Sequence, residues 1–192
     1  MKLLVIILTV LSSFLTNLET RTLQSDFTIT VSEEVNAPMN YPGSLTMCGQ
    51  SFLLKMFNLE AAYDGKTLYM YSPEIDELTL SNPTEQELVE ANPFLYAKAL
   101  VGVCNVVERP SSDAKQTIVT LTPKDRSIGI DRFTLRVRNE DLLPLSIEIK
   151  EGKKTSILKL KEPKFEVQGD KVQVTKYTIL PGTNTYVNDL RL

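Results

Sequence analysis

Histidine, the commonest general base in enzymes, is absent from this 192-residue sequence. Its absence excludes Ser-His-Asp and Cys-His catalysis as well as zinc sites built on histidine. The two cysteines, Cys48 and Cys104, are too few for a thiolate metal cluster. The sequence also contains no P-loop, no dinucleotide-binding fingerprint and no G-x-S-x-G nucleophile motif. Few routes to catalysis therefore remain.

Paired carboxylates are one such route. Glu33-Glu34 and Asp76-Glu77 are adjacent in the sequence, and two acids that flank a glycosidic bond can hydrolyse it. That chemistry depends on a defined separation in space, which adjacency in the sequence does not provide, and acids near strand ends are mostly solvated. We therefore predict that the protein is not an enzyme and uses no metal or cofactor.

Apolar side chains are better candidates for a functional surface. Three methionines, Met47, Met56 and Met70, fall in three different candidate strands. Flexible, polarisable thioethers suit surfaces that accept varied apolar ligands, although they also fill gaps in ordinary cores. The residues predicted to form a hydrophobic ligand cavity or its lid are Met47, Met56, Leu68, Met70, Phe94, Leu95, Leu100 and Val101.

Alternation of apolar and polar residues predicts the strands that must position such a cavity. Phe27, Ile29 and Val31 share one face of a half-buried strand. Similar runs separated by short turns favour an antiparallel meander, and Asp64-Gly65 indicates a two-residue hairpin turn. Strands are expected over 26–31, 43–48, 51–57, 59–63, 66–71, 77–80, 132–138, 145–150, 158–161 and 171–175.

Two helices are expected between the halves of the sheet. Asn82-Pro83-Thr84-Glu85 offers an N-cap, a proline at the first helical position and a capping-box acid. Asn92-Pro93 then starts a helix over 94–103 that is apolar on nearly every side, as a buried helix is. A sheet of about ten strands with one apolar face curls and needs a cover. The predicted fold is mainly β with α (α+β): a large curled antiparallel sheet forming an open half-barrel, its concave face covered by helices.

The N-terminal segment is typical of a signal peptide. Lys2 is followed by an apolar run over 3–11, which is too short to cross a membrane. We predict a signal peptide over 1–20, without a defined cleavage site, and a single domain over 21–192. The alternative is that the apolar run forms a core element of the fold. Export would permit a disulfide between Cys48 and Cys104, and two separately buried thiols are the alternative.

The composition is that of an ordinary globular domain, with 42% hydrophobic and 23% charged residues. The net charge of −3 offers no basic surface for nucleic acid. We therefore expect the protein to bind no nucleic acid. We also expect it to be a monomer.

The hairpin segment Tyr63–Pro73, followed by Asp76–Leu80, forms the most specific motif of the chain. It contains Asp-Gly-Lys-Thr, then an aromatic residue and a tyrosine two residues later. Shorter stretches that accompany it are Asp26-Phe27-Thr28, 43–47 and 186–190. Together these stretches resemble the periplasmic outer-membrane lipoprotein carrier (LolA-like) family.

The resemblance implies an open β-barrel whose helices cover a hydrophobic cavity for the acyl chains of lipoproteins. It implies a periplasmic chaperone that ferries lipoproteins towards the outer membrane. Its partners would be lipoproteins or lipid acyl chains, an inner-membrane ABC exporter and an outer-membrane acceptor. Many family members carry an Arg-Pro whose arginine helps to hold the lid closed, and Cys48-Gly49-Gln50 stands in that place here. The alternative function is a lipid-sensing or adaptor protein of the cell envelope that uses the same cavity to regulate a protein partner.

Overall fold

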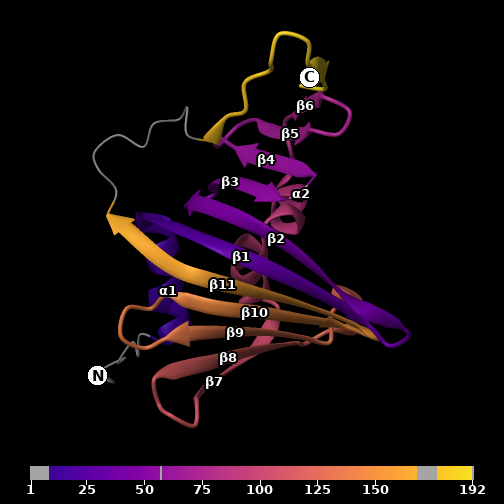
Figure 1. Ribbon diagram of the computed structural model, residues 1–192. Coiled ribbons are helices and arrows are strands. Elements are labelled where there is room, and N and C mark those ends of the chain that lie inside the picture. The colour runs from indigo at the N-terminus through magenta and orange to yellow at the C-terminus, as the bar shows by residue number, and fades with distance from the viewer. Residues whose placement is uncertain (1–8, 57, 168–176, 192) are drawn as a thin grey trace.

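The computed structural model describes residues 9–56, 58–167 and 177–191. Its main element is one sheet of 12 strands in the order β12-β6-β5-β4-β3-β2-β1-β11-β10-β9-β8-β7 (Figure 1). The strands are β1 (Arg21–Glu33), β2 (Asn36–Cys48), β3 (Ser51–Met56), β4 (Leu59–Tyr63), β5 (Leu68–Ser72), β6 (Glu77–Ser81), β7 (Cys104–Pro110), β8 (Gln116–Pro123), β9 (Arg132–Arg138), β10 (Pro144–Glu151), β11 (Lys154–Val167) and β12 (Tyr186–Asp189). The helices of the described residues are α1 (Val10–Thr20), α2 (Glu85–Ala91) and α3 (Pro93–Leu100), with a 3-10 turn η1 (Arg126–Ile128).

Two antiparallel meanders, β1 to β6 and β7 to β11, are joined into one sheet by the pairing of β1 with β11. The register places Phe27 opposite Leu160 and Ile29 opposite Leu158. Register shifts near Gln24 and near Val31 interrupt the pairing of β1, and such irregularities increase the bend and twist of a sheet. The sheet therefore curls into an open half-barrel, which confirms the predicted α+β architecture.

One pairing departs from the antiparallel prediction. The short strand β12 runs parallel to β6, with Tyr186 opposite Glu77. Since six strands lie between β11 and β12 in the sheet, no tight hairpin sets the direction of β12. The strand predicted over 171–175 lies outside the described residues.

The strands β7 and β8 were absent from the sequence prediction. In β8, the side chains of Thr117, Val119 and Leu121 are buried in alternation, but the first of them is polar and obscures the pattern. In β7, the consecutive Val106 and Val107 are both exposed. As β7 is an edge strand beside β8 only, it has no single apolar face to detect.

The connection between β4 and β5 has four residues, so the predicted two-residue Asp64-Gly65 turn was wrong. The carboxylate Oδ1 of Asp64 accepts hydrogen bonds from the backbone N–H groups of Lys66 at 2.9 Å and Thr67 at 2.8 Å. Gly65 supplies the positive φ of 101° that the loop needs. The side chain of Asp64 thus organises a longer loop than the dipeptide alone indicates.

The helix α2 begins two residues later than its sequence signal suggested. Thr84, not Asn82, is the N-cap, and its hydroxyl accepts from the N–H of Glu87 while the Glu87 carboxylate accepts from the N–H of Thr84. The predicted capping box therefore exists with Glu87 as its acid in place of Glu85. The two capping signals overlap in sequence, and the one that satisfies both backbone donors is formed.

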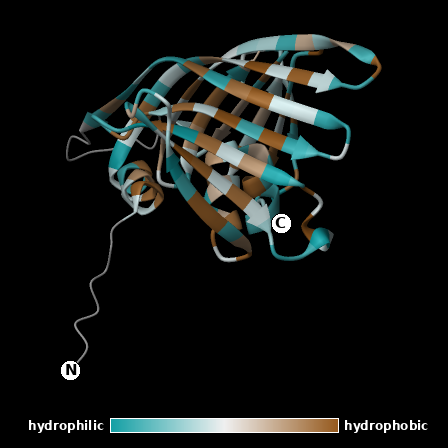
Figure 2. Ribbon diagram, turned by 90° about the horizontal axis from the view of Figure 1, so that it is seen from below, coloured by the Kyte–Doolittle hydropathy of each residue, from teal (hydrophilic) through white to brown (hydrophobic). Residues whose placement is uncertain are grey.

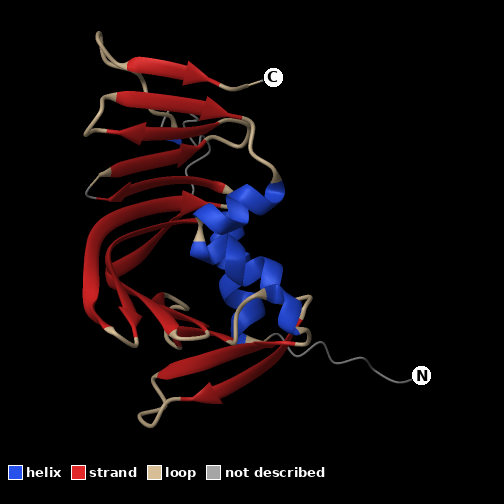
Figure 3. Ribbon diagram, turned by 90° about the vertical axis from the view of Figure 1, so that its right-hand side faces the viewer, coloured by secondary structure: helices blue, strands red, loops and turns tan. Residues whose placement is uncertain are grey.

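The helices lie inside the curve of the sheet (Figure 3), and apolar and polar residues alternate along the strands (Figure 2). α3 starts at Pro93 with Asn92 as its N-cap, as predicted, but ends at Leu100. Val101 and Val103 follow it and are 37% and 45% exposed. The predicted helix over 94–103 was therefore too long. Residues 101–103 lie outside α3, and Val101 and Val103 are exposed to solvent.

The helix α1 belongs to the hydrophobic core. Leu11, Phe14 and Leu18 are at most 5% exposed, and the ring of Phe14 lies 6.2 Å from that of Phe94. The carboxylate of Glu108 on β7 accepts from the first backbone N–H groups of the helix, those of Val10 and Leu11. The segment over 1–20, for which a signal peptide was predicted, thus contains a packed helix in its second half.

Gly43 has no space for a side chain and yields a testable prediction. A Cβ at this position would lie 2.4 Å from Cζ of Phe27 and 2.5 Å from the carbonyl oxygen of Lys55. Because a backbone oxygen cannot swing away, we expect Gly43→Ala to lower the free energy of unfolding by about 2 kcal/mol. Chemical denaturation measures this loss.

Gly102→Ala is the matched control, since a Cβ at Gly102 meets no atom within 4 Å. Its unfolding free energy should stay close to that of the native chain. Phe27→Leu removes the ring from one side of the clash. In the Phe27→Leu protein, Gly43→Ala should therefore lower the free energy of unfolding by less than it does in the native chain. Equal stability of the two alanine variants would contradict the close approach.

Candidate functional site

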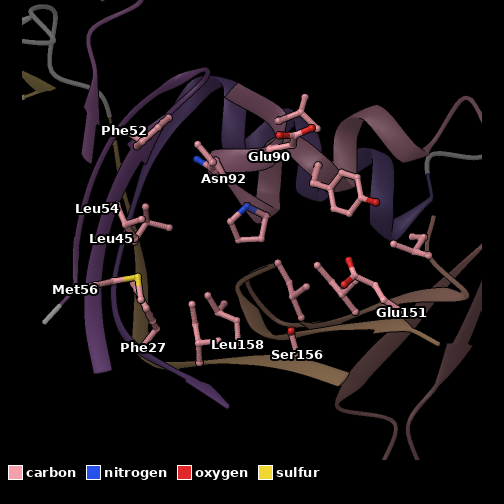
Figure 4. A pocket seen from close by; sticks show the side chains of 18 of the residues that line it. Phe27, Leu45, Phe52, Leu54, Met56, Glu90, Asn92, Glu151, Ser156 and Leu158 are labelled. Atoms are coloured by element: carbon pink, nitrogen blue, oxygen red, sulfur yellow. The ribbon is translucent and has the colours of Figure 1, made fainter. Parts of the chain in front are cut away.

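A cavity of about 650 Å³ lies between the concave face of the sheet and the α2–α3 region (Figure 4). The strands contribute Phe27, Ile29, Leu45, Phe52, Leu54, Met56, Ile147, Ile149, Glu151, Ser156 and Leu158. The α2–α3 region and the segment at the end of η1 contribute Gln86, Val89, Glu90, Ala91, Asn92, Pro93, Tyr96, Ile128, Gly129 and Ile130. Most of these side chains are apolar, so the cavity suits an apolar ligand.

The sheet wall follows from strand periodicity. On β3, Phe52, Leu54 and Met56 are alternate residues and point to the same face. Figure 4 shows these side chains beside Leu45 on one flank of the cavity, with Leu158 on its floor. Because β1 and β2 curve around this space, side chains of distant strands meet across it.

The helical wall depends on Asn92, which links α2 to α3. The side chain is 1% exposed, and its Oδ1 accepts a hydrogen bond of 2.9 Å from the backbone N–H of Phe94, which caps α3. Pro93 then occupies the first turn, where a missing N–H costs nothing. The chain therefore turns sharply here and presents Ala91 and Pro93 to the cavity.

The two covering helices are held to different degrees. On α3, the residues Phe94, Leu95, Ala97 and Leu100 are buried, whereas on α2 only Leu88 is. The α3 side chains also pair with neighbours: Tyr96 meets the Phe133 ring edge-on at 6.2 Å, and Lys98 forms an ion pair of 2.7 Å with Glu19 of α1. α2 is thus the more weakly anchored half of the cover.

The charged groups among the described lining residues are both acidic. Glu90 from α2 and Glu151 from the end of β10 are both exposed, so they mark the solvent side of the cavity. The pKa of the Tyr96 hydroxyl is raised, first by burial and then by the nearby carboxylates of Glu151 and Glu90, with a contribution from Cys104. Both carboxylates therefore act on the same part of the lining.

The eight residues proposed from the sequence occupy different places. Met56 lines the cavity. Met70 and Val101 are 41% and 37% exposed. The others are buried in the core outside the cavity lining: Met47, Leu68, Phe94, Leu95 and Leu100. Sequence reasoning missed the remaining lining residues, although alternation had already placed Phe27 with Ile29 and Ile147 with Ile149 on common faces; the missing information was which face is concave.

Cys48 and Cys104 are both buried, and no disulfide joins them in the described part of the chain. Five strands separate β2 from β7 in the sheet. Burial raises the pKa of the Cys104 thiol, which keeps it protonated and unreactive.

The acid pairs singled out in the sequence have structural partners. Asp76 Oδ1 accepts hydrogen bonds from the hydroxyl of Tyr71 at 3.1 Å and of Thr185 at 2.8 Å, which holds the C-terminal segment beside β6. Glu34 forms an ion pair of 2.7 Å with Lys153 at the hairpin tips. Among the described residues, no group of three acidic or cysteine side chains could hold a metal ion, and no helix is long and apolar enough to span a membrane.

Several solved structures are similar to this chain. An uncharacterized conserved protein from Thermus thermophilus has 13% identity, and the match covers 94% of this chain and 96% of that one with a TM-score of 0.60. A LolA superfamily protein from Nitrosomonas europaea has 14% identity over 87% of this chain and 96% of its own, with a TM-score of 0.44. A putative outer membrane lipoprotein-sorting protein domain from Vibrio parahaemolyticus has 7% identity over 86% and 95%, with a TM-score of 0.43. At 13% identity the similarity to the Thermus thermophilus protein concerns the fold alone.

No protein-family model matches the sequence, and the search of curated proteins finds no match.

Proposed function

We propose that this protein is an exported periplasmic carrier that shields the acyl chains of lipoproteins in its cavity and carries them towards the outer membrane. The observation that supports this function is the apolar cavity of about 650 Å³ under the α2–α3 cover. Its size lies within the usual range of ligand pockets, about 300–1,000 Å³. We infer lipoproteins as the cargo from the resemblance of the Tyr63–Pro73 hairpin to the LolA-like family.

Burial of an acyl chain supplies the binding energy. Each methylene removed from water contributes about 0.8 kcal/mol, and the lining offers Ile, Leu, Phe and Met side chains on several strands. A carrier must also give up its cargo, which requires a cover that moves. α2 is suited to this role because Leu88 is its one buried residue, while Val89 and Ala91 pack against the core only partly buried.

Native mass spectrometry of the protein purified from its own cell envelope tests the carrier. We expect co-purifying lipoprotein or acyl lipid, together with mislocalised lipoproteins when the protein is deleted from the cell. Protein that is always empty, combined with normal lipoprotein sorting in the deletion strain, would contradict the proposal. Bound lipid with normal sorting would instead support a lipid-sensing or adaptor function for the same cavity.

A further inference from the structure

The charged residues that line the described cavity have one sign. Among the described residues that line the cavity, Glu90 and Glu151 are the charged ones, and neither Lys nor Arg occurs. They come from opposite sides, one from the helical cover and one from the sheet (Figure 4). An amphiphile whose chain fills the apolar interior must place its polar head near these two carboxylates.

The immediate neighbours neutralise these acids only in part. The amide of Gln86 donates to Glu90 Oε1 at 3.0 Å and carries no charge. Lys154 Nζ lies 3.8 Å from Glu151 Oε2, with both side chains more than 40% exposed, and such long, solvated pairs are weak. Tyr96, whose pKa both acids raise, bears no positive charge. A negative potential therefore remains where a head group would sit.

We propose that the mouth formed by Glu90 and Glu151 selects amphiphiles with a cationic head over those with an anionic head. This inference rests on the proposed function, since it assigns the head-group class of the ligand that the cavity takes. An ammonium group would be attracted by both carboxylates, whereas a carboxylate or phosphate head would be repelled by both and would meet no cation among the described lining residues.

The test uses three amphiphiles with the same dodecyl chain: dodecylammonium, dodecanoate and uncharged dodecyl maltoside. Each displaces the uncharged fluorophore N-phenyl-1-naphthylamine from the full protein at neutral pH, below its micelle concentration. We expect dodecylammonium to bind about tenfold more tightly than dodecanoate at low salt, because exposed ion pairs contribute a factor of a few each. High salt should reduce this ratio.

The double variant Glu90→Gln, Glu151→Gln should bring the ratio to about twofold or less. The double variant Glu140→Gln, Glu162→Gln is the matched control, because both residues are exposed, lie outside the cavity lining and remove the same net charge. An unchanged ratio in the first variant, or equal binding of all three amphiphiles to the native chain, would overturn this inference and leave the proposed function standing. Failure of all three to displace the fluorophore would overturn both.

Discussion

A chain that begins at Arg21 is expected to lose its cooperative fold. Deletion of residues 1–20 removes α1 and with it the buried side chains of Leu11, Phe14 and Leu18. Each large core side chain is worth about 2–5 kcal/mol, so the total loss matches the entire stability of a typical domain, about 5–15 kcal/mol. Thermal unfolding followed by near-UV circular dichroism should show no native transition.

The deletion also uncovers groups that α1 now satisfies. Phe94 loses its aromatic neighbour, and the N–H of Gly49 loses the Leu18 carbonyl, which it now contacts at 2.7 Å. Deletion of residues 1–8 is the matched control, since it keeps Thr9, the N-cap of α1. Equal melting temperatures of the two chains would show that α1 is dispensable.

The position of α1 also bears on export. If a signal peptide over 1–20 were removed, the mature protein would lack the core helix Val10–Thr20. N-terminal sequencing of the protein isolated from its envelope therefore decides whether the helix is retained. A mature chain that starts before Val10 would retain the core helix, and one that starts near residue 21 would have to fold without it.

The fold class could be predicted because each half-buried strand repeats the same alternation of apolar and polar residues. Phe133, Leu135 and Val137 are all fully buried, as their alternation indicated. The edge strand β7 and the parallel strand β12 escaped prediction, since an edge strand need not bury one face and a distant pairing leaves no local trace. α1 shows a related limit, because it shares only Val10 and Leu11 with the apolar run over 3–11, and polar residues separate its other buried side chains, Phe14 and Leu18.

The cavity was harder to locate than the sheet. Alternation says which residues share a face, but the sign of the curvature decides whether that face lines a cavity. Met70 illustrates the limit, because it lies on β5, two strands away from the cavity-lining strand β3, and is 41% exposed. Leu54 shows the converse, since its apolar neighbour Leu53 on β3 hides the alternation that places Leu54 in the lining.

Ile29→Asp is expected to abolish most of the binding capacity of the cavity. Ile29 lies on β1, lines the cavity and is only partly buried, so the empty protein can keep a carboxylate there in water. A bound acyl chain would strip that water away, and desolvation of an unpaired charge costs several kcal/mol. The affinity for N-phenyl-1-naphthylamine or dodecyl maltoside should fall at least tenfold, measured by fluorescence titration.

Thr28→Asp provides the control because it adds the same charge to the same strand on the opposite face. Thr28 is partly exposed and does not line the cavity, so this variant should bind as the native chain does. Ile29→Asn separates shape from charge: the amide is nearly isosteric with the carboxylate and should weaken binding less, because a neutral group is less costly to dehydrate. Similar affinities for Ile29→Asp and Thr28→Asp, with both proteins folded by circular dichroism, would place the ligand elsewhere than on the concave face.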